Sequence, residues 1–322
     1  MCPAVWRWFF LASRIQSIGM LFLSYGLFVG LAIGMVFNGV LSTVVFHFTR
    51  QSSMITALLL VGFGLGGMVL STACSALMAQ WGWRFTFLLL GGLFVVLTLL
   101  GALVITAPPS LRSVKAHTFE GTQVTTGKML RRPAYLLIFF WCTALSSSCL
   151  VLFGHAALCS ADIGASPFVA ALSSGVVSLF NVVARLVVGG VQQRIGKTKT
   201  AYMLTFIGIG SSLICLLGYR LYYMPLLLLG YALLGFLNGG CTIWLNTYIM
   251  ETYGKEHFGM NMAVTNVHLA IASILGPAVA GYIKTAFGSY TYAFFVMIAL
   301  SLLSLVLLAV KVKITGKKQN AV

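Results

Sequence analysis

The chain has 322 residues, of which 60% are hydrophobic and only 7% are charged, and its mean hydropathy is +1.00. This composition excludes an ordinary soluble domain and is typical of a polytopic α-helical membrane protein. The formal net charge of +16 does not indicate a nucleic-acid partner, because the basic residues lie in short loops between apolar runs. The first partner that the sequence predicts is therefore the lipid bilayer.

The chain begins with a short apolar patch over residues 1–18, which Arg7 and Arg14 interrupt. This patch is too short to cross a bilayer and resembles the tail of a helix. Longer apolar runs follow, each long enough at about 20 residues to span the membrane. We expect nine membrane helices, near 19–47, 54–80, 84–106, 134–158, 166–192, 200–219, 223–249, 259–284 and 290–311.

One long polar segment, residues 107–133, divides the chain. It predicts an incomplete N-terminal helical bundle over 1–106, a linker, and a C-terminal six-helix bundle over 134–322 that ends in a short tail. Loops that face the cytoplasm are enriched in Lys and Arg. With the linker on the cytoplasmic side, most Lys and Arg fall inside, so we expect a multi-pass protein of the cell membrane whose linker and C-terminus are cytoplasmic.

Glycines and an internal repeat indicate how the helices are arranged. At an offset of 206 residues, several positions of the first half match the second, as parallel-repeat transporters do. The matched pairs are Tyr25 with Tyr231, Leu27 with Leu233, Leu31 with Leu237, Gly34 with Gly240 and Gly82 with Gly288. This symmetry predicts about three further helices ahead of the first complete span. Glycines spaced four apart predict close helix packing or sliding contacts, and they include Gly26, Gly30, Gly34, Gly235 and Gly239.

Arg185 is the most informative side chain, because it lies inside the apolar run 166–192. A charge at membrane depth costs about 2.5–3.5 kcal/mol on insertion scales and usually faces a cavity or a partner. The four acidic residues of the chain all lie outside the apolar runs. A guanidinium binds a carboxylate through two parallel hydrogen bonds, so we expect Arg185 to bind a substrate carboxylate. The alternative is an arginine that extends towards the membrane surface.

Other polar residues within apolar runs are further candidates for the same cavity. Asn181 lies one turn before Arg185 and shares its helix face, where it could orient the ligand or bond a neighbouring helix. His268 could carry a coupled proton or bond the substrate, or it could be a neutral packed histidine. The asparagines Asn38, Asn246 and Asn266 are expected to line the cavity.

Several segments resemble the Major Facilitator Superfamily, and within it the oxalate/formate-antiporter or monocarboxylate-transporter-like branch. The segments are YGLFVGLAIGMVFNGVLSTVVFHF at 25–48, LLLVGFGLGGMVLS at 58–71, GWRFTFLLLG at 82–91, FNVVARLVVGGVQQRIGKTK at 180–199 and MNMAVTNVHLAIASILGPAVAGYI at 260–283. The resemblance implies two six-helix bundles around a central cavity with alternating access. It also implies that the nine spans are the fourth to twelfth helices of the family and that the chain is truncated at its N-terminus.

The family has a gating-loop signature, Gly-x-x-x-Asp-Arg-x-Gly-Arg/Lys, and the chain matches it in part. The matching residues are Gly189 or Gly190, Arg194, Gly196 and Lys197. Gln193 stands where the family has its acid, which puts normal gating in doubt. The branch has an arginine at the position of Arg185. Some oxalate carriers add a lysine in the eleventh helix, and none lies within 259–282 here, so the pattern favours a monocarboxylate over a dianion.

The function that these residues predict is secondary active transport of a small organic anion, coupled to a proton or to an exchanged anion. The sequence has no HExxH or GxSxG motif and no acid pair within the apolar runs, so we do not expect an enzyme. The seven cysteines lack metal-ligand spacing, so we expect no metal or cofactor. The alternatives are a non-transporting remnant of such a carrier and a carrier of another small solute or drug.

Overall fold

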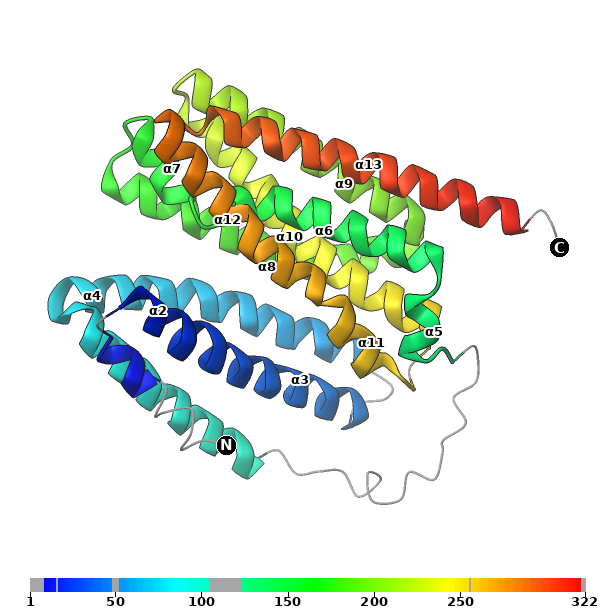
Figure 1. The fold of residues 1–322 in the computed structure, drawn as a ribbon, viewed down its shortest axis with the longest axis horizontal. Helices are drawn as coiled ribbons and strands as arrows, with labels where there is room; N and C mark the ends of the chain where they lie inside the picture. The colour runs from blue at the N-terminus through cyan, green and yellow to red at the C-terminus, as the bar shows by residue number, and fades with distance from the viewer. Residues whose placement is uncertain (1–8, 16, 48–51, 105–122, 255, 320–322) are drawn as a thin grey trace. The chain divides into compact units, whose positions relative to one another are not determined.

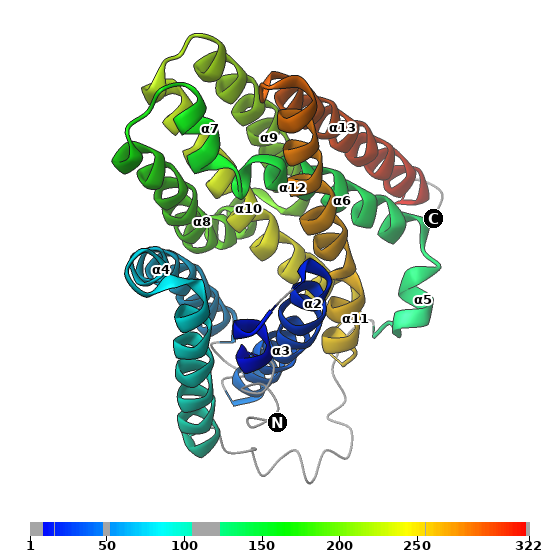
Figure 2. The same cartoon turned by 60° about the vertical axis from the view of Figure 1, so that its left-hand side comes forward.

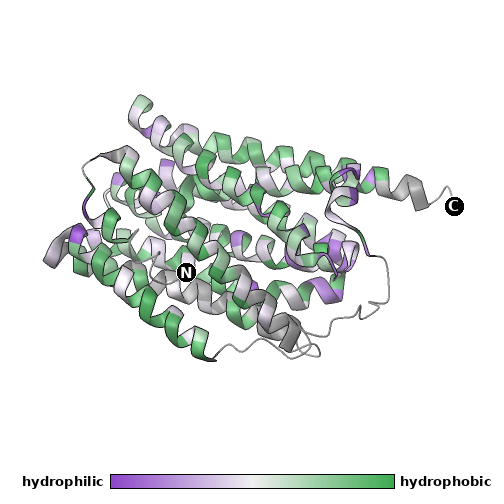
Figure 3. Ribbon diagram, turned by 60° about the horizontal axis from the view of Figure 1, so that its bottom comes forward, coloured by the Kyte–Doolittle hydropathy of each residue, from purple (hydrophilic) through white to green (hydrophobic). Residues whose placement is uncertain are grey.

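The computed structural model describes residues 9–15, 17–47, 52–104, 123–254 and 256–319 (Figure 1). All regular structure within these residues is helical, which confirms the expected all-α class. The helices form two units, residues 1–117 and 118–322, which are described separately below. Figure 3 shows hydrophobic residues along the helices and hydrophilic ones mainly towards the helix ends, as a bilayer requires.

The first unit contains a small core. Phe9 and Val29 are buried, and Phe87, Leu90 and Phe94 pack against them. Residues 9–13 of this unit are helical, and they are followed by α2 (Ile18–Leu21), the π-helix η1 (Phe22–Val29), α3 (Gly30–His47) and α4 (Ser52–Val104).

The second unit contains a larger, continuous core and nine helices among its described residues. Its helices are α5 (Thr126–Leu130), α6 (Pro133–Phe153), α7 (Ala156–Asp162), α8 (Pro167–Ile195), α9 (Lys197–Arg220), α10 (Met224–Tyr253), α11 (Phe258–Thr265), α12 (Val267–Phe287) and α13 (Thr291–Gln319).

Eight segments of the described chain are long and apolar enough to cross a membrane. They correspond to eight of the nine expected spans. They are Gly19–Phe37, Gln80–Leu103, Pro133–Phe153, Pro167–Ile195, Lys197–Arg220, Met224–Tyr253, Phe258–Phe287 and Thr291–Ile314. The remaining one, near 54–80, falls in the first part of α4, where most side chains lie outside the described residues, so it stays a prediction.

Two expected spans differ in detail from the structure. The run 134–158 is not one helix, because α6 ends at Phe153 and the short helix α7 follows it. The run 259–284 is divided into α11 and α12 at Asn266. Hydropathy alone passes over both interruptions, since the residues on either side remain apolar.

The end of the expected linker belongs to the second unit. Residues 126–130 form α5. Val124, two residues before this helix, and Met129, near its end, are both buried. The Val124 N–H donates to the Tyr253 carbonyl at 2.9 Å, which attaches this segment to the end of α10. The expected linker residues 107–122 lie outside the described residues.

Helix α10 is central to the second unit, with α8, α9 and α6 packed around it (Figures 1 and 2). Its glycines permit this packing. A Cβ atom at Gly235 would lie 2.1 Å from the Val177 carbonyl oxygen, and one at Gly239 would lie 2.0 Å from the Asn181 carbonyl oxygen. The predicted close contact at this glycine pair is therefore confirmed, and it brings the backbones of α8 and α10 together.

The repeat-related glycines Gly82 and Gly288 both lie at junctions between spans. Their φ angles are 77° and 69°, in the region that residues with a Cβ atom avoid. Gly82 lies at a kink inside α4, and Gly288 ends α12. The two halves of the chain thus have a glycine with a positive φ at matching positions, although the ψ angles of 165° at Gly82 and −2° at Gly288 show that the two backbone conformations differ.

Candidate functional site

One face of α8 carries a row of buried polar side chains. Asn181, Arg185 and Gln192 have exposed fractions of 5%, 7% and 4%. Their spacing of four and seven residues places them on one side of an α-helix with 3.6 residues per turn. Val177 and Val188, on the same side, pack against α10. The row therefore lies beside the α8–α10 contact.

Gln192 is a member of this row that sequence analysis missed. Both polar atoms of its amide are buried and have no hydrogen-bond partner among the described residues. A buried amide in this state costs about 1–3 kcal/mol for each unsatisfied group. Its spacing of seven residues from Arg185 is the signal that could have identified it.

His268 lies just after the break between α11 and α12. Its Nδ1 is 2.7 Å from the carbonyl oxygen of Thr265. A carbonyl oxygen only accepts, so Nδ1 carries the hydrogen and the neutral ring has Nε2 as its acceptor. The Leu269 N–H, which would continue the helix ladder to Thr265, donates to the Asn266 carbonyl at 3.0 Å instead. Discontinuous helices of this kind form binding sites in several transporter folds.

The three candidate asparagines are in different situations. Asn246 is half-buried on α10 and its Nδ2 donates to the Thr242 carbonyl at 2.8 Å, within its own helix. Asn266 is half-buried at the break between α11 and α12. Asn38 belongs to α3, and its side chain lies outside the described residues. None of these placements tests a role in binding.

The predicted gating loop is the tight junction between α8 and α9. Gly196 forms the turn with a φ of 83°, while Gly190 and Arg194 are exposed on α8. Lys197 starts α9, where its carbonyl accepts from Trp244 Nε1 at 2.8 Å and its Nζ lies 2.8 Å from Glu251 Oε2.

Glu251 thus supplies a carboxylate to the junction that has Gln193 in place of an acid. Sequence analysis missed this residue, because it comes from the end of α10 and no local motif marks it. The side chains of Lys197 and Glu251 are 35% and 45% exposed, so the ion pair contributes at most about 1 kcal/mol. Its main effect is to hold the junction against α10.

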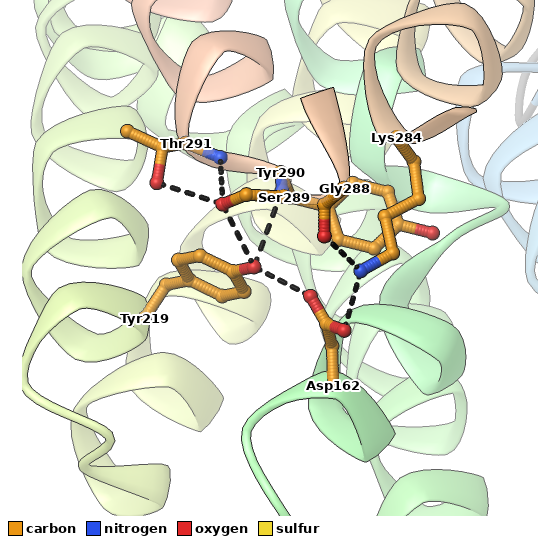
Figure 4. A network of polar contacts seen from close by, with 7 residues as sticks. All are labelled: Asp162, Tyr219, Lys284, Gly288, Ser289, Tyr290 and Thr291. Atoms are coloured by element: carbon orange, nitrogen blue, oxygen red, sulfur yellow. Dashed lines mark hydrogen bonds and ion pairs between the residues drawn. The ribbon is translucent and has the colours of Figure 1, made fainter. Parts of the chain in front are cut away.

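A second polar network ties together helix ends at the α7 end of the unit (Figure 4). Asp162 accepts from Lys284 Nζ at 2.5 Å and from the Tyr219 hydroxyl at 2.5 Å. The Tyr219 hydroxyl in turn accepts from the Tyr290 N–H at 3.2 Å. These contacts join α7, α9 and α12 to the start of α13.

The electrostatics of this network follow from the ion pair. Partial burial on its own would raise the pKa of Asp162, but the hydrogen bonds from Lys284 and Tyr219 outweigh it and lower that pKa below its ordinary value. Burial is the main reason that the pKa of Tyr290 rises to about 12, and the Asp162 carboxylate adds to it. Asp162 is therefore ionised and Tyr290 neutral at physiological pH.

The structure separates the candidate residues into two groups within the second unit. Asn181 and Arg185 lie on α8, which packs on α10 and α7, whereas His268 lies on α12, which packs on α6 and α13. A cavity of about 440 Å³ lies between α6, α12 and α13. Its lining is apolar and includes none of the candidate residues, so it is distinct from both groups.

The sequence was compared with known protein families and with curated proteins. The family model described as Major Facilitator Superfamily matches residues 3–158 and 136–321. The chain is similar to monocarboxylate transporter 13 of Bos taurus, at 25% identity over 287 residues, and to monocarboxylate transporter 12 of Xenopus laevis, at 22% over 308 residues. These matches cover 89% and 88% of this chain and 66% of each relative.

A bacterial protein gives a match of the same kind. The uncharacterized MFS-type transporter YhjX of Escherichia coli K12 is 24% identical over 270 residues, which is 83% of this chain and 66% of that protein. The chain thus spans just under two thirds of the length of the curated relatives that it matches.

Proposed function

Because this chain belongs to the Major Facilitator Superfamily, we propose that it acts as a secondary active transporter of a small organic anion of the monocarboxylate class. Alternating access between two helical bundles is the mechanism that this family membership supports. The names of the mammalian and amphibian relatives favour the same substrate class. An enzymatic function has no support, because the matched family consists of membrane transporters.

Arg185 is the observation on which the proposal depends. This residue lies within α8, which is long and apolar enough to span a membrane, and it is only 7% exposed. Its guanidinium group presents a planar fork that matches a carboxylate, and low surrounding polarity strengthens that pairing. A single cation of this kind suits a single carboxylate better than a dianion.

The other candidates have supporting roles in the proposal. Asn181, one turn away, orients the bound carboxylate, and His268 accepts or donates the coupled proton in a symporter or bonds the substrate in an antiporter. Asn38, Asn246 and Asn266 line the path. The junction of Gly190, Arg194, Gly196 and Lys197, held by Glu251, limits the movement of α8 against α10.

We also propose an orientation in the cell membrane, with residues 107–133 and the C-terminus in the cytoplasm. The support is the concentration of Lys and Arg in the loops on that side. Cysteines placed in the linker and labelled in intact cells with an impermeant reagent test this orientation. Strong labelling of the linker would contradict it.

Uptake of labelled monocarboxylates into vesicles that contain the protein tests the substrate class. We expect Arg185→Ala to abolish uptake and Arg185→Lys to reduce it, because lysine keeps the charge but loses the planar fork. Arg220→Ala, an exposed change in the last turn of α9, is the matched control and should leave uptake unchanged. Full uptake by Arg185→Ala at normal protein abundance would falsify the carboxylate site.

A further inference from the structure

A continuous set of hydrogen bonds begins at the segment that precedes α6. The Asn261 Nδ2 on α11 donates to the Val124 carbonyl at 3.1 Å, and the Thr126 hydroxyl donates to Asn261 Oδ1 at 2.7 Å. Asn261 has no exposed surface, so both halves of its amide are satisfied inside the protein by this segment. The segment therefore fixes the position of Asn261, and with it α11.

The set continues from Asn261 to the end of α11. The Thr265 hydroxyl donates to the Asn261 carbonyl at 2.6 Å. A hydroxyl has one hydrogen, so at its 3.2 Å contact with Tyr135 the Thr265 oxygen accepts and the Tyr135 hydroxyl donates. Thr265 is fully buried and is held from two sides, by α6 and by its own helix.

Thr265 then determines how His268 is placed. Its carbonyl, which the helix ladder leaves available at the break, accepts from His268 Nδ1 at 2.7 Å. Phe139 packs edge-on against the same imidazole, with ring centroids 6.5 Å apart. The orientation and the tautomer of His268 thus depend on where the Thr265 carbonyl points.

We propose that Thr126 and Asn261 are positioning residues for His268, and that they couple the docked segment 123–130 to the imidazole through Thr265. A change that releases the segment from Asn261 frees α11 and lets the Thr265 carbonyl turn away. The coupling is reciprocal, because two linked sites change one another's equilibrium by the same factor. Loss of the imidazole therefore loosens the segment.

The inference goes beyond the transport function and does not depend on it. The two quantities measured are the tautomer of His268 and the hydrogen exchange of the backbone amides in 123–130, and neither measurement requires a substrate. A failed uptake assay would count against the proposed function alone, and an unchanged His268 would count against the coupling alone.

The first test compares three conservative changes in the full chain, purified in detergent. Thr126→Val removes the hydroxyl at nearly constant shape, Thr126→Ser retains it, and Thr125→Val alters the exposed neighbour, which makes no side-chain cap bond. The nitrogen-15 shifts of His268 report its tautomer when they are recorded about two pH units above the usual histidine pKa of about 6.5. His268→Gln identifies the signal.

We expect wild type and Thr126→Ser to show the Nδ1–H tautomer. Thr126→Val should shift the tautomer ratio towards Nε2–H by about three- to tenfold, which is the range for loss of one hydrogen bond. Thr125→Val should match wild type. An unchanged ratio in Thr126→Val, or an equal shift in Thr125→Val, would overturn the proposal.

The second test runs in the opposite direction, from His268 to the segment, and it keeps the proposal falsifiable if Thr126→Val fails to fold. Hydrogen exchange of the backbone amides in 123–130 is measured in wild type and in His268→Gln. We expect the hydrogen-exchange rate of this segment to increase in His268→Gln by about the same three- to tenfold factor as the tautomer ratio shifts in Thr126→Val. Protection equal to that of wild type contradicts the coupling, because a reciprocal coupling must appear from both ends.

Discussion

The glycine stripes of the two units make an instructive contrast. In the second unit, Gly235 and Gly239 on α10 lie against the backbone of α8, where an added Cβ would approach a carbonyl oxygen to about 2 Å. In the first unit, Gly30 and Gly34 follow the same spacing, yet no atom of the described residues lies within 4 Å of a Cβ at either position. One sequence pattern thus accompanies a close helix contact in one unit and, among the described residues, no close approach to these glycines in the other.

Burial of the spans shows the same contrast. In the apolar 18-residue stretch of each span, 61% of the residues are buried in α6 and in α10. The corresponding fractions are 17% in Gly19–Phe37 and 11% in Gln80–Leu103. Small residues permit helices to approach, but contact also needs a partner helix whose surface fits. A glycine stripe in a sequence therefore predicts a possible contact, and the tertiary structure decides whether one forms.

The largest expected effect tests this contrast directly. Gly239→Ala should destabilise the protein by about 3 kcal/mol, because the new methyl group overlaps the Asn181 carbonyl and the backbones must separate. Gly30→Ala should change stability by less than about 1 kcal/mol and in the favourable direction, since alanine is the better helix former. Thermal unfolding in detergent measures both. Equal losses would contradict the difference between the two stripes.

The repeat-related turns provide the next effect in size. Gly82 combines a φ of 77° with a ψ of 165°, a region open almost only to glycine, whereas Gly288 has a ψ of −2° in the left-handed region. We expect Gly82→Ala to cost about 2 kcal/mol and Gly288→Ala about 1 kcal/mol. This prediction separates backbone strain from packing, because no atom in the described part of the chain lies within 4 Å of a Cβ at either site. A harmless Gly82→Ala would contradict the turn.

The network at Asp162 should have a smaller effect that depends on pH. Asp162→Asn removes the charge that binds Lys284 and Tyr219, and we expect a loss of about 1–1.5 kcal/mol at neutral pH, since the site is partly exposed. The folded-state pKa of Asp162 lies below its unfolded value. Its contribution is therefore complete above about pH 4 and is lost as the pH falls through the folded pKa.

Unfolding midpoints of wild type and Asp162→Asn, recorded across this pH range, check the sign. The two curves should differ at neutral pH and converge under acidic conditions. Tyr219→Phe is the matched control for the hydroxyl alone and should show a smaller loss with the same pH trend. Curves that separate further in acid would contradict the assignment of the charge.

Much of this architecture could be predicted from the sequence, because long apolar runs are a local property. The runs that became α8, α9 and α10 were placed to within a few residues at both ends, and the run that became α13 was placed to within one residue at its start. The division of 259–284 at Asn266 could not be predicted. At this break the His268 ring bonds the Thr265 carbonyl and the Leu269 N–H donates to the Asn266 carbonyl, and neither side-chain nor backbone hydrogen bonding leaves a hydropathy signal.

The candidate site was predictable to a similar degree. A charge within an apolar run identified Arg185, and helical spacing added Asn181 to the same face. Glu251 could not be found in this way, because its pairing with Lys197 arises only when α9 folds back onto α10. Gln192 lies seven residues after Arg185 on the same helix face, but its burial, with an exposed fraction of 4%, is a property of the folded structure that the spacing alone does not give.

The smallest expected effect concerns the ion pair between Lys197 and Glu251, and it asks whether charge or packing holds the second unit together. Both side chains are more than a third exposed, so water and salt screen the attraction between their charges. A double-mutant cycle with Lys197→Met and Glu251→Gln should give a coupling of about 0.5 kcal/mol in thermal unfolding, which falls as salt is added. The Trp244 bond to the Lys197 carbonyl is retained in every variant, so the cycle isolates the charges. A coupling above about 2 kcal/mol that resists salt would show that charge, and not the glycine-mediated contact of α8 with α10, dominates at this junction.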